Sequence, residues 1–288
     1  MKQVILNADD FGLTRGINEG IIRSHREGIL TSATLMATGP AFGDAVERAK
    51  ATPELGIGCH LVLTGGISVA PPEKISSLAS KDGRLPETLA AFVARVSSGR
   101  IRSADIETEL RAQIGKIRQA GIEPTHVDTH KHTHVHPRVM AVVARVARDL
   151  GITRIRNPVE SLTDSWRSTR SDGAGRIKDL AASAAVLSVG RNFRMISRKY
   201  NLHYPEHFLG LAATGRLSAA ALRELIDTLP DGNTEIMLHP GVCDADLART
   251  GSRLQQQRQT EMEALLSPEA RHAVEVRDVR LITFRQLN

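Results

Sequence analysis

Short apolar runs alternate with amphipathic segments along the whole chain. The run at residues 4–8 ends in Asp9-Asp10-Phe11-Gly12, a pattern that predicts a buried strand followed by a loop. Residues 17–26 have helical spacing, and Gly28 ends that helix. Further strands are expected at residues 32–37, 55–63, 125–129, 152–156, 208–211, 235–239 and 280–284. Helices are expected near residues 41–51, 87–97, 104–120, 137–150, 219–229 and 253–266.

This alternation predicts the fold class. Strand and helix alternate without a break in composition, which favours one α/β domain over residues 1–288 with a mainly parallel sheet. Seven to eight such units close most simply into an irregular (β/α) barrel resembling a TIM barrel. A doubly wound open sheet is the alternative. Residues 158–205 interrupt the rhythm, so we expect an inserted helical and loop segment there, with a basic amphipathic helix near residues 177–200.

Polar residues with catalytic potential follow several of the predicted strands. Asp9 and Asp10 end the first strand, His60 lies in the third, and His239 ends a late one. Functional residues of parallel α/β folds gather at the carboxyl ends of the strands, so we expect these side chains to meet. A carboxylate beside a buried strand needs a cation or several hydrogen-bond donors. One aspartate could bind a metal while its neighbour accepts a proton.

The segment between residues 126 and 136 is unusually rich in histidine. Five histidines and Asp128 occupy its even positions, which in an extended chain would place them on one side. Imidazole and carboxylate are common ligands of divalent metals. Metal-storage tracts are low-complexity tails, whereas this segment is internal. Since a catalytic site takes about three protein ligands, the remaining histidines would surround the site, and Asp128 would orient an imidazole or hold a substrate hydroxyl.

Composition narrows the remaining function classes. The 288 residues are 41% hydrophobic and 24% charged, which is typical of a globular protein. The net charge of +6 comes mainly from arginines spread along the chain, aromatic residues make up 3%, and no nucleic-acid-binding motif occurs, so no nucleic-acid partner is expected. Two distant cysteines, no signal peptide and no apolar run of about 20 residues favour a cytoplasmic protein.

Four motifs in chain order resemble a known family. They are Asn7-Ala8-Asp9-Asp10-Phe11-Gly12, Gly58-Cys59-His60-Leu61, the run from Thr125 to His134, and His239-Pro240-Gly241. Together they resemble the YdjC-like carbohydrate deacetylases, which include chitooligosaccharide deacetylases and hopanoid-associated deacetylases. The matches extend from residue 4 to about residue 241. The Asp-Thr-His-Lys-His run, with Lys131, looks closer to the hopanoid-associated branch.

The resemblance implies a barrel enzyme that uses one divalent metal ion, zinc or magnesium, to remove acetyl groups from N-acetylated amino sugars. It implies that Asp10, His60 and His130 bind the metal. Asp9 would be the catalytic base, and His239 the acid or a donor to the oxyanion. The residues assigned to substrate binding or to the surroundings of the ligands are Asp128, His132 and His134.

Two other functions stay open at this point. A metal-dependent phosphoesterase or cyclic amidohydrolase on a similar barrel would often hold two metals, and a non-catalytic histidine-rich protein would bind metals loosely. The basic helix could lie on an anionic membrane and present a lipid-linked sugar, although a helix packed on the barrel explains the same pattern. Its basic residues are Lys178, Arg191, Arg194, Arg198 and Lys199. A homo-oligomer is compatible with the sequence.

Overall fold

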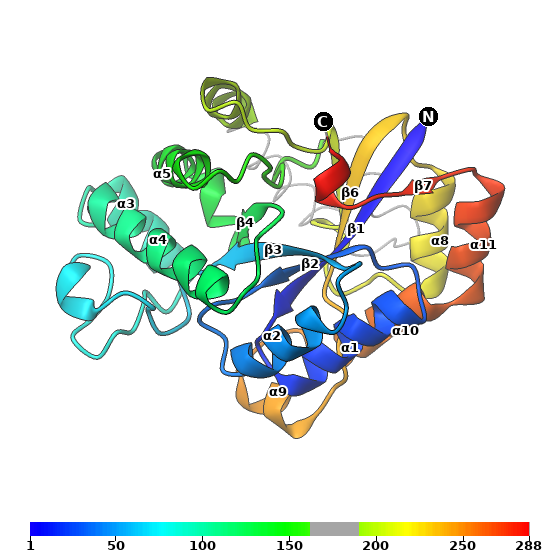
Figure 1. The fold of residues 1–288 in the computed structure, drawn as a ribbon, viewed down its shortest axis with the longest axis horizontal. Coiled ribbons are helices and arrows are strands. Elements are labelled where there is room, and N and C mark those ends of the chain that lie inside the picture. The colour runs from blue at the N-terminus through cyan, green and yellow to red at the C-terminus, as the bar shows by residue number, and fades with distance from the viewer. Residues whose placement is uncertain (162–189, 288) are drawn as a thin grey trace.

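The fold is built around one long buried strand. The computed structural model describes residues 1–161 and 190–287. β1 (Lys2–Phe11) lies at the centre of a parallel sheet with the order β4-β3-β2-β1-β6-β5, and β7 pairs with the first half of β1 (Figure 1). The other strands are β2 (Ser32–Leu35), β3 (Gly56–Leu61), β4 (Val127–Thr129), β5 (His207–Leu209), β6 (Gly232–Leu238) and β7 (Arg280–Leu281). Strands of a parallel sheet are covered on both faces, which explains the continuous apolar run in β1.

The sheet curls into part of a barrel. Beyond β4, Val127 pairs with Ile155 and Arg154 pairs with His203, so isolated bridges extend this edge toward the segment that leads into β5. Residues 152–156, expected to be a strand, take part only through these bridges. The predicted α/β fold with a parallel sheet is confirmed, while closure into seven or eight units stays a prediction.

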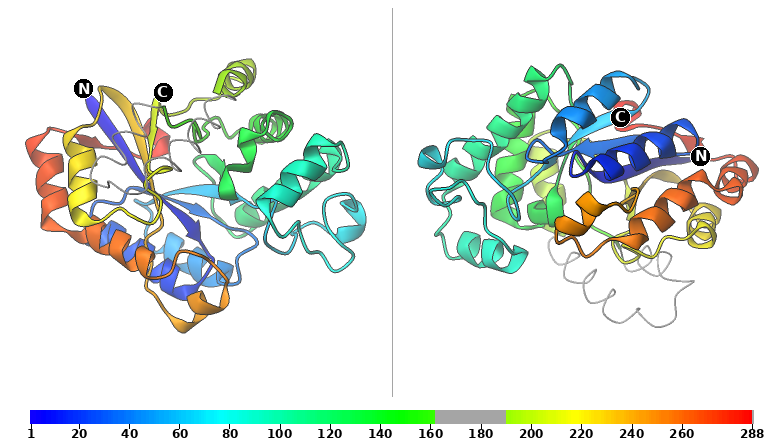
Figure 2. Two further views of the ribbon diagram at one scale, coloured as in Figure 1. Left: turned by 180° about the vertical axis from the view of Figure 1, so that it is seen from behind. Right: turned by 90° about the horizontal axis from the view of Figure 1, so that it is seen from below.

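Helices cover the outer side of the curled sheet (Figure 1). They are α1 (Arg15–Arg26), α2 (Phe42–Lys50), α3 (Leu89–Ser97), α4 (Ser103–Gln119), α5 (Pro137–Asp149), α8 (Ala219–Asp227), α9 (Ala245–Arg249), α10 (Gln256–Leu266) and α11 (Pro268–Val276). Short 3-10 segments lie at η1 (Pro72–Lys74), η2 (His130–Val135) and η3 (Phe284–Gln286). The N-terminal α1 packs beside the C-terminal α10 (Figure 2). None of the described helices is long and apolar enough to span a bilayer.

The inserted segment is described only in part. Residues 190–199 are helical, whereas residues 177–189 of the expected basic helix lie outside the described residues. Phe193 is buried against the core and Met195 is exposed. The single domain with an insertion at about 158–205 therefore stays a prediction.

The interior of the sheet is closed at one end by an aromatic stack. The ring of Phe284 in η3 lies 3.6 Å from that of His126, within a small cluster that also holds Ile5. Gly58 on β3 leaves room for this imidazole, because a Cβ there would lie 2.3 Å from the His126 ring. His126 is thus a packed interior residue at the amino-terminal side of β4, away from the carboxyl ends of the strands.

Candidate active site

Three side chains from distant parts of the chain meet at the carboxyl ends of the strands. Asp10 Oδ1 lies 3.2 Å from His130 Nδ1 and 3.5 Å from His60 Nε2, and the two nitrogens are 3.3 Å apart. Asp10 and His60 are buried, and His130 is partly exposed. The predicted convergence of these three residues is confirmed in the structure.

A local irregularity in β1 turns Asp10 toward the histidines. The pairing register between β1 and β2 shifts between Ala8 and Phe11, and Asp10 adopts a left-handed backbone with φ of 67°. Such bulges re-aim side chains, and left-handed non-glycine residues are concentrated at functional sites. In a regular strand Asp9 and Asp10 would face opposite sides. The irregularity lets both carboxylates join one polar cluster.

His60 is oriented by a buried carboxylate. Its Nδ1 lies 2.8 Å from Asp128 Oδ1, since β3 and β4 pair these two residues in register. With the Nδ1 proton donated to Asp128, the Nε2 lone pair points to Asp10 and His130. Burial opposes the charged imidazole, but Asp128 and Asp9 raise the pKa of His60 to about 10. Without a metal the His60 ring is therefore protonated at neutral pH, and a metal ion would bind the Nε2 lone pair in place of that proton.

The three donor atoms fit a single metal ion. Ligands about 2.1 Å from a tetrahedral ion are about 3.4 Å apart, which matches the observed separations. No donor among the described residues reaches the buried Asp10 Oδ1 with hydrogen-bond geometry. A buried carboxylate oxygen that lacks a hydrogen-bond donor needs a cation nearby. Two imidazoles and one carboxylate are a ligand set suited to zinc and to several other divalent ions.

Asp9 is held by Arg156, a residue that the sequence analysis did not single out. Arg156 Nη1 and Nη2 donate to the two oxygens of Asp9 at 2.7 and 2.6 Å. Burial alone would raise the pKa of Asp9, but the Arg156 charge overcomes it and lowers that pKa below its usual range. Arg156 also contacts Asp128 Oδ2 at 2.6 Å and Glu235 Oε1 at 2.7 Å. Its position as the last residue of the expected strand 152–156 was the available signal.

A second cluster of side chains that could bind a metal is already paired with the guanidinium of Arg156. Asp9, His60 and Asp128 also lie close enough together to hold an ion. Arg156 bonds to both of these carboxylates and is fully buried, so its fixed positive charge neutralises them. Among the described residues, the arrangement therefore favours one metal ion rather than two.

α10 contributes two more buried charged residues that the sequence analysis missed. Arg258 Nη2 lies 2.5 Å from Asp10 Oδ2. Burial would raise the pKa of Asp10, but Arg258 and the two imidazoles lower it well below its usual value. Glu261 accepts the backbone N–H groups of His239 and Gly215 at 2.6 and 2.9 Å, and burial raises its pKa to about 7.

His239 lies next to the two aspartates. Burial lowers its pKa to about 4, although the charges of Asp9 and Asp10 act in the opposite direction. The imidazole is therefore neutral at neutral pH. Its buried Nδ1 has no hydrogen-bond partner among the residues described. A neutral imidazole with a free ring nitrogen can accept or hand over a proton.

The histidine run does not stay extended, so the prediction of six groups on one side is wrong. β4 ends at Thr129, and the chain turns through η2, where Lys131 and His132 have left-handed backbones. His130 directly follows β4 and precedes the two left-handed residues of this turn. His134 instead lies buried with Nδ1 2.6 Å from Thr129 Oγ1, and His132 lies near Phe208. Neither belongs to a group that could hold a metal among the residues the structure describes, and their role in substrate binding stays a prediction.

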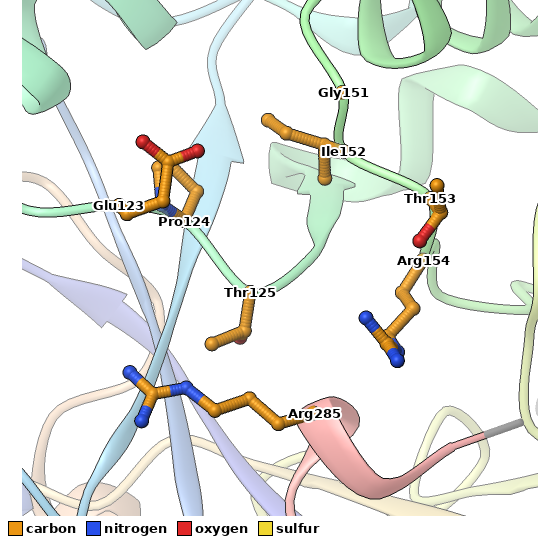
Figure 3. A pocket seen from close by; sticks show the side chains of 8 residues that line it. All are labelled: Glu123, Pro124, Thr125, Gly151, Ile152, Thr153, Arg154 and Arg285. Atoms are coloured by element: carbon orange, nitrogen blue, oxygen red, sulfur yellow. The ribbon is translucent and has the colours of Figure 1, made fainter.

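The hollow drawn in Figure 3 is separate from this cluster. It has a volume of about 380 Å³ and lies at the amino-terminal side of β4, between Thr125, Arg154 and Arg285 (Figure 3). None of the side chains gathered around Asp10 lines it.

Comparisons with known proteins identify the family of this chain. The model of the YdjC-like protein family matches residues 3–276. The chain is 35% identical to a carbohydrate deacetylase from Geobacillus stearothermophilus, over 99% of this chain and 98% of that one. It is 31% identical to a chitooligosaccharide deacetylase from Klebsiella pneumoniae, over 99% of both. A crystal structure from Enterococcus faecalis, described as a putative cellobiose-phosphate cleavage protein, superposes with a TM-score of 0.77 at 27% identity, covering 98% of this chain and 97% of that one. The chain therefore belongs to the YdjC-like family.

Proposed function

We propose that this chain is a metal-dependent carbohydrate deacetylase that hydrolyses the acetamide of an N-acetylated amino sugar and releases acetate. The observation that carries the proposal is the cluster of Asp10, His60 and His130 beside the ion-paired Asp9. Family membership and relatives named carbohydrate and chitooligosaccharide deacetylases support it. Arg156 between Asp9 and Asp128 argues against the two-metal phosphoesterase or amidohydrolase.

Asp10, His60 and His130 would hold the ion. When bound, a divalent ion supplies a Lewis acid that polarises the acetamide carbonyl and acidifies water. Zinc and magnesium are both candidates; two imidazoles favour zinc, because magnesium prefers oxygen ligands. Asp128 keeps the Nδ1 proton of His60 in place, so that Nε2 presents its lone pair to the site.

Asp9 would accept the proton of the attacking water. Its low pKa keeps the carboxylate ionised, so it can take a proton only from a strongly acidified water. Arg156 holds both oxygens of Asp9 and fixes the carboxylate in one orientation. His239, neutral and with a free Nδ1, would donate a hydrogen bond from its ring N–H to the developing oxyanion, or relay to the departing amine the proton that Asp9 takes from water. Acetate and a free amino sugar are the products.

Finer details of the substrate also belong to this proposal. A lipid-linked sugar and membership of the hopanoid-associated branch are supported by the Asp-Thr-His-Lys-His run and by the basic residues at 191–199. Liposome co-sedimentation tests the membrane contact, and failure to bind anionic vesicles at low salt would end it. A cytoplasmic location and a homo-oligomeric state are proposed on the sequence alone.

A screen for acetate release tests the proposed reaction. Protein stripped with a chelator would be offered N-acetylglucosamine oligomers and N-acetylated glycolipids, with zinc, magnesium or manganese added back singly. Metal-dependent acetate release from at least one of them is expected. If cyclic amides or phosphate esters were hydrolysed and no N-acetylated sugar were, the proposal would be wrong.

A further inference from the structure

The two oxygens of the Asp10 carboxylate have different surroundings. Oδ1 faces the ring nitrogens of His60 and His130, whereas Oδ2 is bound by Arg258 at 2.5 Å. The side chains of Asp10 and Arg258 are 5% and 2% exposed, so water does not screen this contact. The guanidinium is a permanent positive charge, which disfavours a metal cation beside Oδ2.

Arg258 is itself held in place by its helix and by a neighbouring turn. Its backbone carbonyl accepts the N–H of Gly241 at 3.1 Å, and its Nε donates to the Leu254 carbonyl at 3.3 Å. One turn further along α10, Glu261 accepts the N–H of His239. The main chain of Arg258 is therefore fixed beside the turn that carries His239, and its guanidinium lies between Asp10 and the Leu254 carbonyl.

We infer that Arg258 restricts Asp10 to one metal-ligating oxygen and thereby sets which divalent cations the site prefers. This inference rests on the proposed metal site. With Oδ2 occupied, the protein offers three single-atom ligands, a set suited to small borderline ions such as Zn²⁺. A carboxylate free to bind through both oxygens favours larger, harder cations such as Mn²⁺ and Ca²⁺, which accept more oxygen ligands. Arg258 is thus a positioning residue for a metal ligand.

Metal affinities of the stripped protein test the inference without any activity measurement. Zn²⁺, Mn²⁺ and Ca²⁺ would each be titrated in competition with a chromophoric chelator. In Arg258→Met, which keeps an apolar stem, Mn²⁺ and Ca²⁺ affinities should rise relative to Zn²⁺ by about tenfold or more, the scale of effects seen for groups that hold metal ligands. The control is Arg249→Met on α9, since Arg249 is largely exposed and should leave all three affinities unchanged.

A second variant keeps the test decisive if Arg258→Met does not fold. Arg258→Gln keeps an N–H donor in the cavity but removes the charge, and it should shift the preference in the same direction. An unchanged ratio of affinities in whichever variants fold would overturn the inference. Loss of metal binding in His130→Ala alongside an unchanged ratio in the Arg258 variants would leave the metal site standing and reject only the role of Arg258. Absence of any divalent-metal binding by the unmodified protein would reject both.

Discussion

The carboxylate of Asp9 and the guanidinium of Arg156 form a two-pronged ion pair inside the curled sheet, with contacts of 2.6 and 2.7 Å and a sequence separation of 147. Arg156 is also shared with Asp128 and Glu235. One guanidinium therefore connects the proposed base, the carboxylate that orients a metal ligand, and a buried glutamate. This connection explains why three acidic side chains can lie so close together.

Replacing Asp9 should separate catalysis from metal binding. Asp9→Asn keeps one oxygen acceptor for Arg156 but cannot take a proton, so acetate release should fall by about 100-fold or more while metal content stays the same. Initial rates and metal analysis on the same preparation check this. Near-normal acetate release would show that Asp9 is not the base.

Replacing His130 should weaken metal binding and abolish catalysis together. His130→Ala deletes one of three ligands, so metal affinity should fall at least about tenfold and turnover should be lost with it. Equilibrium dialysis against Zn²⁺ gives the affinity. His272→Ala, an exposed histidine on α11, is the control. The ligand assignment fails if His130→Ala binds metal as tightly as the control.

Replacing Arg156 should destabilise the protein strongly. Arg156→Met leaves Asp9, Asp128 and Glu235 buried without their shared cation, and breaking such a pair costs about 3–5 kcal/mol. Urea unfolding of the metal-free protein measures the loss. Arg145→Met removes a partly exposed ion pair to Glu107 and should cost at most about 1 kcal/mol. Equal losses in the two variants would mean that the network contributes little.

Glu235 should make the free energy of unfolding depend on pH. Burial raises its pKa to about 8, even though Arg156 acts in the opposite direction. In the folded protein Glu235 therefore keeps a proton that it loses near pH 4.5 in the unfolded chain. The stability that this difference contributes is fully present below pH 4.5 and is lost as pH rises toward 8.

The matched variant is Glu235→Gln, which cannot ionise. Between pH 5 and 8 its free energy of unfolding should fall less than that of the unmodified protein, as measured by urea unfolding of the metal-free forms. Parallel pH profiles for the two proteins would show that Glu235 ionises normally in the fold.

Strand prediction placed the candidate polar residues at strand ends, and the family resemblance singled out three of them as proposed metal ligands. Asp10, His60 and His130 are far apart in the chain, yet parallel strands bring their carboxyl ends to one edge. The shape of the histidine run was not predictable, since its turn depends on left-handed Lys131 and His132 rather than on period-two alternation. His130 follows β4 directly, and the turn begins only after it.

The sequence analysis missed the buried charged residues around the site for a different reason. Arg258 and Glu261 resemble ordinary surface residues of an amphipathic helix, and only the packing of α10 against α1 buries them. Glu235 gave a weak signal, because a glutamate inside an apolar strand needs a partner. α11 was also missed, although Ser267 before Pro268 is a recognisable helix start.

The central claim is that one divalent ion, held by Asp10, His60 and His130, is required for acetate release. The most direct test titrates the chelator-stripped protein with Zn²⁺ or Mg²⁺ while acetate release from an N-acetylglucosamine dimer is followed. We predict that activity rises in proportion to bound metal and reaches its plateau at one ion per chain. Full activity without metal, or a plateau only at two ions per chain, would contradict the account.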